Sequence, residues 1–181
     1  MRNLKFDLTN IAEIDSGLWT IGRLFDGVDF DYVTQSVLSC PQDLYAPSPA
    51  NPHTRNEMTW KNDGILEDLY NAFSSFTPAI CKLTGMNLTF GQVRVWQDLP
   101  GFMIPFHEDD QSSAAHIQIY IDAASDDIGT TWYTSKGRYS CPFIPNSGYL
   151  TICDRRLPHG MLKPVIGQTR YSLYATFAKS V

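Results

Sequence analysis

Three residues in the second half of the chain have the types and the spacing of metal ligands. His107 and Asp109 are separated by one residue, so in an extended segment both side chains point to the same face. A second imidazole, His159, follows later in the chain. Two histidines and one carboxylate on one face of an octahedral ion leave three positions open, which suits the oxygen chemistry of non-haem Fe(II). We therefore predict a catalytic metal site at His107, Asp109 and His159, and the phase of the strand favours Asp109 over the adjacent Asp110.

A histidine and an aspartate at this spacing are weak evidence by themselves, because most such pairs are ordinary surface residues. Other histidines show how common a single imidazole is. His53 lies in a polar segment, and His116 opens an alternating strand with Gln118 and Tyr120 on the same side. We interpret His116 as a core residue or a neighbour of the ligands. The metal prediction therefore needs a further, independent feature.

That feature is Arg170, which shares one face of a strand with Ser172. A buried arginine requires an anion, and a guanidinium binds a carboxylate through two parallel hydrogen bonds, to which a neighbouring hydroxyl adds a third. The metal and the arginine would then hold the two ends of a dicarboxylate. The alternative is that Arg170 forms a structural salt bridge, with Asp154 or Asp122 as the partner.

The order of the three ligands and of the Arg-x-Ser pair resembles the iron- and 2-oxoglutarate-binding signature of the Fe(II)/2-oxoglutarate-dependent oxygenases. Two segments are similar to the prolyl-hydroxylase-like branch of that superfamily: Cys-Asp-Arg-Arg-Leu-Pro-His-Gly at 153–160 and Ile-Tyr-Ile-Asp at 119–122. The resemblance extends over about residues 92–177. It implies a double-stranded β-helix, a jelly-roll or cupin-like fold, with helices packed on its outer sheet.

The resemblance also implies roles for individual residues. The predicted triad holds the iron, while Arg170, with Tyr120 and Ser172, binds the distal carboxylate of 2-oxoglutarate. Trp96 departs from the family pattern, because it stands where the family has a tyrosine ahead of a glycine-containing turn. This departure bears on the inner part of the cosubstrate site and on the substrate pocket, where we place Trp96.

The implied activity is a dioxygenase that uses Fe(II), 2-oxoglutarate and O2. It hydroxylates a peptidyl substrate, with proline as one option, or a small molecule, and it converts 2-oxoglutarate to succinate and CO2. Asp109 favours hydroxylation, because glycine or alanine at that position would leave room for chloride and halogenation. Two alternatives stay open: a cupin-like metal enzyme that does not use 2-oxoglutarate, and a non-catalytic binding module of the same fold.

The elements that position these residues divide into a helical part, about 28–85, and a β part, about 87–178. Apolar spacing predicts helices at 30–38 and 65–76, with a second helical stretch to about Leu83 that Gly85 caps. Alternating or β-branched runs predict the strands, at 4–9, 18–24, 88–90, 93–96, 115–122, 130–133, 148–153 and 170–177. The predicted helices precede most of the predicted strands, which are short. This order predicts one α+β domain over 1–181, mainly β, built on a sandwich or barrel.

A polar connection at 42–63 separates the two predicted helical segments. Long loops in compact domains often cover or line binding sites, so we predict that 45–64, with Arg55 and Trp60, lies at the pocket mouth and contacts substrate. An ordinary surface loop is the alternative interpretation.

Composition narrows the class of protein further. The 181 residues carry a formal net charge of -5, and the basic residues form no arm or stripe, so nucleic acid is not an expected partner. No apolar run has the length of a signal peptide or a membrane span. The four cysteines lack zinc-like spacing. We therefore expect a cytoplasmic protein with reduced thiols and no membrane partner; the oligomeric state is open.

Overall fold

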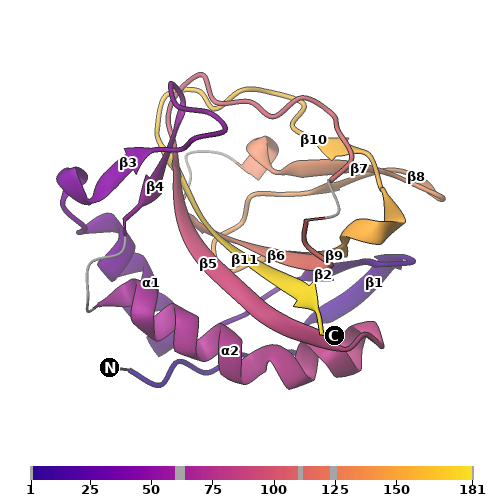
Figure 1. Ribbon diagram of the computed structural model, residues 1–181. Coiled ribbons are helices and arrows are strands. Elements are labelled where there is room, and N and C mark those ends of the chain that lie inside the picture. Colours follow the sequence, from indigo (N-terminus) through magenta and orange to yellow (C-terminus); the bar gives the residue numbers. More distant parts are fainter. Residues whose placement is uncertain (1, 60–63, 110–111, 123–125, 181) are drawn as a thin grey trace.

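The computed structural model of the protein describes residues 2–59, 64–109, 112–122 and 126–180. This part of the chain contains two α-helices, α1 (Gly27–Leu38) and α2 (Ile65–Thr84), and two antiparallel sheets (Figure 1). Three short 3-10 turns connect these elements, at Gln42–Leu44, Asp126–Ile128 and Cys153–Arg155.

The larger sheet has eight strands and contains most of the strand residues. In spatial order these are β1 (Ile11–Asp15), β2 (Leu18–Ile21), β9 (Gly148–Ile152), β6 (Ala115–Asp122), β11 (Arg170–Lys179), β5 (Leu88–Asp98), β4 (Arg55–Met58) and β3 (Tyr45–Pro47). The smaller sheet has three strands, in the order β10 (His159–Gly160), β7 (Thr130–Thr134) and β8 (Gly137–Cys141).

The two sheets form a double-stranded β-helix, as the sequence predicted. In Figure 1 the large sheet curves, both helices lie against its outer face, and the small sheet lies across from its inner face. An isolated antiparallel bridge between His107 and His159 adds one more segment to the edge of the small sheet, beside β10. We call the place where this segment meets β10 the mouth of the β-helix.

Two hydrophobic cores follow from this layering. One lies between the helices and the outer face of the large sheet, and it includes Ile117 and Ile119 of β6. The other joins strands of both sheets, with Tyr120 and Trp132 among its members. Strand β6 faces both cores, which explains why its apolar and polar residues alternate while nearly all of them are buried. The predicted strand at 115–122 is confirmed at both ends.

The N-terminal strand predictions are partly wrong. Residues 4–9 form no strand; Phe6 makes one isolated bridge to Phe25 and packs its ring 4.8 Å from that of Phe73. The first strand is instead β1, and β2 ends at Ile21. Aromatic packing on α2, rather than pairing in the sheet, explains why the segment around Phe6 is apolar.

Four further features of the structure differ from the predicted elements. The polar connection contains the hairpin β3–β4, which an alternation of apolar residues does not reveal, and β8, which was not predicted, pairs with β7. The helix α2 runs unbroken through Pro78, and β5 is one strand whose partner β11 is irregular between Thr176 and Phe177. Within the described residues, no helix is long and apolar enough to cross a membrane.

Candidate metal and cosubstrate site

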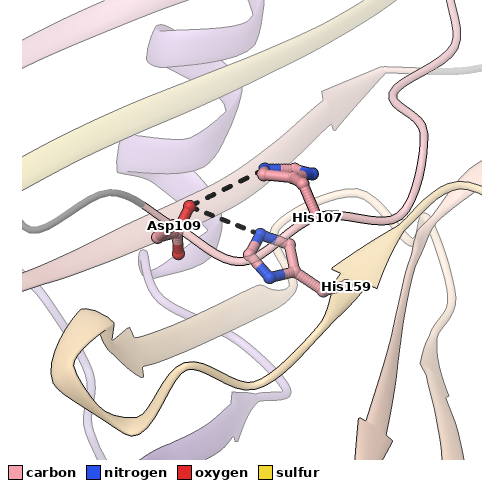
Figure 2. A group of neighbouring side chains, drawn as sticks. All are labelled: His107, Asp109 and His159. Atoms are coloured by element: carbon pink, nitrogen blue, oxygen red, sulfur yellow. Dashed lines mark ion pairs between the residues drawn. The ribbon is translucent and has the colours of Figure 1, made fainter.

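The three predicted metal ligands lie together at the mouth of the β-helix (Figure 2). The backbones of His107 and His159 exchange two hydrogen bonds, of 2.9 and 2.8 Å, which place the two imidazole rings 4.6 Å apart, centre to centre. Asp109 turns one carboxylate oxygen toward both rings, at 3.8 Å from His107 Nε2 and 3.5 Å from His159 Nε2. The backbone bridge between His107 and His159 thus brings residues that are far apart in sequence into one cluster.

Backbone carbonyls fix which nitrogen of each ring is available. His107 Nδ1 lies 2.9 Å from the carbonyl oxygen of Pro105, and His159 Nδ1 lies 2.9 Å from that of Leu157. A carbonyl only accepts hydrogen bonds, so Nδ1 carries the proton in both rings and Nε2 presents a lone pair toward Asp109. Burial lowers the pKa of His159, which the Asp109 carboxylate partly opposes, so this ring is neutral and able to bind a metal near pH 7.

The arrangement fits a metal ion. Ligand atoms about 2.1 Å from one ion and at right angles to each other lie roughly 3.0 Å apart. The ligand atoms of His107, Asp109 and His159 lie within 4.8 Å of one another, and the two Nε2–Oδ1 distances are 3.5 and 3.8 Å. These separations are too long for direct hydrogen bonds and slightly wider than a shared ion requires. Two nitrogens and one oxygen suit Fe(II) and other divalent first-row metals.

One pocket contains both the candidate metal ligands and Arg170. Its empty space, including the solvent at its opening, is about 440 Å³, and polar side chains converge in it beside aromatic and apolar ones. Besides the triad and Arg170, the lining comprises Trp96, Ile104, His116, Gln118, Thr130, Tyr149, Gly160, Met161 and Tyr174. Polar groups that converge beside an apolar wall are typical of cofactor and substrate sites.

Arg170 is buried and paired with Asp98, a partner that the sequence did not predict. Its Nε donates to Asp98 Oδ2 at 2.8 Å, its Nη2 lies 2.6 Å from the same oxygen, and its Nη1 donates to the carbonyl of Ile128 at 2.5 Å. The alternative partner Asp154 pairs with Lys179 instead. A guanidinium has five N–H groups, so these contacts leave donors with which Arg170 can bind a carboxylate in the pocket.

Asp98 also binds a second buried arginine. Its Oδ1 accepts from Arg55 Nε at 2.5 Å and its Oδ2 from Arg55 Nη2 at 3.1 Å. In the sheet register, Asp98 of β5 is opposite Arg170 of β11 on one side and Arg55 of β4 on the other. Two guanidiniums share one carboxylate, and all three side chains are at most 4% exposed. The cluster therefore carries one net positive charge, which a bound anion would neutralise.

The other two residues predicted for the cosubstrate lie behind the pocket wall. Ser172 Oγ accepts a hydrogen bond from Gln118 Nε2 at 3.0 Å. The Tyr120 hydroxyl donates to Thr130 Oγ1 at 3.3 Å and accepts from the Thr130 backbone N–H at 3.2 Å. Gln118 and Thr130 line the pocket themselves. In this arrangement Ser172 and Tyr120 orient the side chains of Gln118 and Thr130.

Tyr149 is a pocket residue that sequence reasoning missed. Its hydroxyl donates to Gln118 Oε1 at 2.6 Å, and burial strongly raises the pKa of Tyr149, so the phenol stays protonated. Gln118 could have been found from its place on the same face of β6 as His116. Tyr149 offered no comparable signal, because every residue of β9 is buried.

The predicted substrate residues have different positions. Arg55 is only 3% exposed, with its guanidinium between the rings of Trp96 at 3.7 Å and Phe102 at 4.1 Å. It still contributes to an open groove outside the metal pocket. Trp96 lines both the pocket and the groove and stacks on Tyr174, with ring centres 4.2 Å apart. Trp60 lies outside the described residues.

Comparison with known proteins gives matches among solved structures alone: no protein-family profile matches the sequence, and neither does any curated protein. A prolyl-4-hydroxylase from Pseudomonas putida superposes with a TM-score of 0.71 at 15% identity, covering 91% of this chain and 94% of that one. The chain has the fold of the 2-oxoglutarate–iron(II) oxygenases. A prolyl hydroxylase from Trichoplax adhaerens, in complex with a peptide fragment of the hypoxia-inducible factor, has a TM-score of 0.69 at 16% identity, covering 91% and 84%.

The fold also matches a protein solved with a small-molecule ligand. HygX from Streptomyces hygroscopicus, solved with nickel, 2-oxoglutarate and hygromycin B, has a TM-score of 0.65 at 8% identity, covering 91% of this chain and 84% of that one. At these identities the likeness establishes the fold, and it agrees with the prolyl-hydroxylase-like resemblance of the sequence. The chemistry of this chain has to be argued from its own residues.

Proposed function

We propose that this protein is an Fe(II)- and 2-oxoglutarate-dependent dioxygenase that hydroxylates a peptidyl or small-molecule substrate. The observation that carries the proposal is a shared pocket. Two imidazoles and a carboxylate converge in it, and a buried arginine lines the same space. A dicarboxylate that binds a metal through one end and an arginine through the other is the ligand that this combination suits.

In this proposal His107 and His159 hold the iron through Nε2, and Asp109 holds it through one oxygen. Arg170 binds the distal carboxylate of 2-oxoglutarate with the N–H groups that Asp98 leaves. When bound, iron and 2-oxoglutarate supply the oxidising chemistry, with O2 as the oxidant and succinate and CO2 as the products of the cosubstrate.

The chain's own contribution is orientation and the exclusion of water. Carbonyls hold both imidazoles in one tautomer, so neither ring has to move its proton before Nε2 binds the metal. Ile104, Met161 and the stacked pair Trp96–Tyr174 give the pocket an apolar wall. An apolar wall keeps bulk water from the reacting groups and strengthens the hydrogen bonds of Arg170.

The substrate enters, in this proposal, from the open groove beside the metal ligands. The groove is lined by the hairpin residues Ala50, Asn51 and Arg55, by β5 and β11, and by the segment that carries the ligands. It shares Trp96, Tyr174 and the triad residues His107 and Asp109 with the pocket. A peptide, with proline as one option, or a small metabolite placed there would reach the metal.

One observation favours a second candidate, a cupin-like metal enzyme that does not use 2-oxoglutarate. Arg170 already has a carboxylate partner in Asp98, so it does not require a ligand for its burial to be tolerated. The net charge of the Arg55–Asp98–Arg170 cluster favours the first candidate, because one positive charge remains unbalanced.

Absorption spectroscopy under anaerobic conditions tests the proposal. Fe(II) and then 2-oxoglutarate are added to the metal-free protein. We expect a weak visible charge-transfer band that requires both additions, is lost in His159→Ala and Arg170→Ala, and persists in the exposed control variants His53→Ala and Arg138→Ala. Bound iron without such a band would remove 2-oxoglutarate from the account and support the cupin-like candidate.

A further inference from the structure

The second oxygen of Asp109 faces a different set of donor atoms. Both dashed lines in Figure 2 run to the oxygen that His107 and His159 share. The other oxygen, Oδ2, lies 3.6 Å from His116 Nδ1, and that nitrogen lies 3.7 Å from Cys153 Sγ. The three donor atoms Asp109 Oδ, His116 N and Cys153 Sγ all lie within 4.8 Å of one another.

The two separations measured from His116 Nδ1 are close to those of a tetrahedral zinc site. Zinc binds histidine nitrogen at about 2.0–2.1 Å and cysteine sulfur at about 2.3 Å, so tetrahedral angles place N and S roughly 3.5 Å apart and N and O roughly 3.3 Å apart. The distances from His116 Nδ1, 3.7 Å to sulfur and 3.6 Å to oxygen, exceed these values only slightly. The third separation, between the Asp109 oxygen and Cys153 Sγ, lies within 4.8 Å, so the three atoms would have to draw together to contact one ion.

The donor types select a different kind of metal from the one expected at the neighbouring triad. A thiolate is a soft ligand that zinc and similar thiophilic ions prefer, whereas the triad offers only imidazole and carboxylate. The charges of the three ligands also favour a divalent cation. One thiolate, one carboxylate and a neutral imidazole cancel the two charges of a divalent cation, which matters because His116 and Cys153 are 2% and 3% exposed.

The strands hold two of the donors in place. His116 lies in β6 and its register partner Thr151 lies in β9, directly before the turn that carries Cys153. The Cys153 backbone N–H donates to the carbonyl of Ala114 at 3.0 Å. His116 lines the metal pocket, which gives an ion a route to the site.

We propose that Asp109, His116 and Cys153 form a second metal site, which binds a thiophilic divalent cation such as Zn²⁺. Asp109 belongs to both sites, so occupation of the second site changes the charge and the orientation of a ligand of the first. The site requires neither 2-oxoglutarate nor turnover, and its existence does not depend on the proposed oxygenase activity.

A variant that lacks the two triad imidazoles, His107→Ala/His159→Ala, isolates the second site. Cobalt(II), which substitutes for zinc and reports its ligands, is titrated into this variant with the thiols reduced. We expect an intense near-ultraviolet thiolate-to-cobalt band that saturates at one equivalent. The band should disappear when Cys153→Ser or His116→Ala is added. It should persist with Cys141→Ser, which removes another buried thiol.

The outcome that overturns the proposal is equally definite. If the folded variant shows no thiolate-to-cobalt band, Cys153 and His116 only share a hydrogen bond. A band that survives Cys153→Ser would assign the thiolate to another cysteine and would also overturn the site. Circular dichroism establishes that each variant is folded.

X-ray absorption of zinc in the unaltered protein keeps the test independent of folding defects. With two equivalents of zinc bound, we expect a sulfur scatterer about 2.3 Å from part of the metal, lost in Cys153→Ser. A shell of nitrogen and oxygen alone at two equivalents would exclude the second site, while leaving the triad and the proposed oxygenase function untouched.

Discussion

Asp98 and Arg170 face each other across the neighbouring strands β5 and β11, and the same carboxylate holds Arg55 from β4 on its other side. A buried arginine that would otherwise require a ligand is therefore stabilised within the protein itself. The cost of this arrangement is a surplus of one positive charge among three buried groups, next to the pocket that contains the metal ligands. This surplus charge affects both the stability of the protein and its affinity for an anion.

Replacing Asp98 with asparagine should destabilise the protein by about 3–5 kcal/mol, because two buried guanidiniums lose their shared counter-charge. Urea unfolding monitored by tryptophan fluorescence measures the change. The matched control is Asp154→Asn, which removes the exposed partner of Lys179 and should cost about 1 kcal/mol or less. Equal effects of the two substitutions would contradict the view that the Asp98 cluster is structurally distinct.

Replacing Arg55 with methionine should weaken 2-oxoglutarate binding although Arg55 lines the groove and not the pocket. The substitution leaves a neutral Asp98–Arg170 pair, so the dianion loses the attraction of one charge. We expect about a tenfold higher dissociation constant, roughly 1.4 kcal/mol at the effective dielectric constant of a protein. Titration of the Fe(II)–2-oxoglutarate band measures it.

Two controls separate charge from packing at this position. Arg55→Lys keeps the charge and should restore most of the affinity, whereas the exposed Arg138→Met should change nothing. If Arg55→Lys binds as weakly as Arg55→Met, the geometry of the guanidinium rather than its charge determines affinity.

Local sequence patterns predicted those elements whose packing imposes a regular spacing of apolar residues. The spacing of α2 arises from burying one face, and the alternation in β6 arises because its two faces pack in different cores; each pattern is visible in the chain itself. The hairpin β3–β4 was not predictable in this way. Its strands have only three and four residues, β3 ends in a proline, β4 is mainly polar, and β4 is held by pairing with β5, a partner distant in sequence.

In the candidate site, too, some features were predictable from the sequence and others were not. Ligand types and their order along the chain are enough to indicate His107, Asp109, His159 and Arg170. The pairing of Arg170 with Asp98 was not predictable, because it depends on the register of two strands separated by most of the β-helix. The hydrogen bond between Gln118 and Tyr149, which joins β6 to β9, was not predictable for the same reason.

We expect Gly160 to set the distance between the two imidazoles of the proposed metal site without touching a ligand atom. A Cβ at this position would lie 2.9 Å from backbone atoms of Pro105 and Phe106, in the segment that carries His107. Gly160→Ala should therefore push β10 away from that segment, with a loss of about 1–3 kcal/mol in stability and a weaker affinity for Fe(II). Metal titration and urea unfolding report the two effects.

Gly27→Ala is the matched control for Gly160, because nothing lies within 4 Å of a Cβ added there and the position is helical. It should leave metal affinity unchanged and stabilise slightly. Unaltered Fe(II) affinity in Gly160→Ala would show that the bridge between His107 and His159 tolerates displacement.

Cys141 should give the stability of the protein a dependence on alkaline pH. Burial between the sheets raises the pKa of this thiol to about 12, against a usual value of 9.0. Because the pKa is higher in the folded state, the unfolded chain loses the proton first as pH rises, and stability present below pH 9 is lost above it. Between pH 8 and pH 10 the loss should be about 1.4 kcal/mol.

The measurement compares unfolding free energies of the unaltered protein and Cys141→Ala at both pH values, so that the contributions of tyrosine and lysine ionisation cancel. The difference between the two proteins should shrink by this amount at pH 10, and a constant difference would mean that the Cys141 thiol ionises as readily in the folded chain as in the unfolded one.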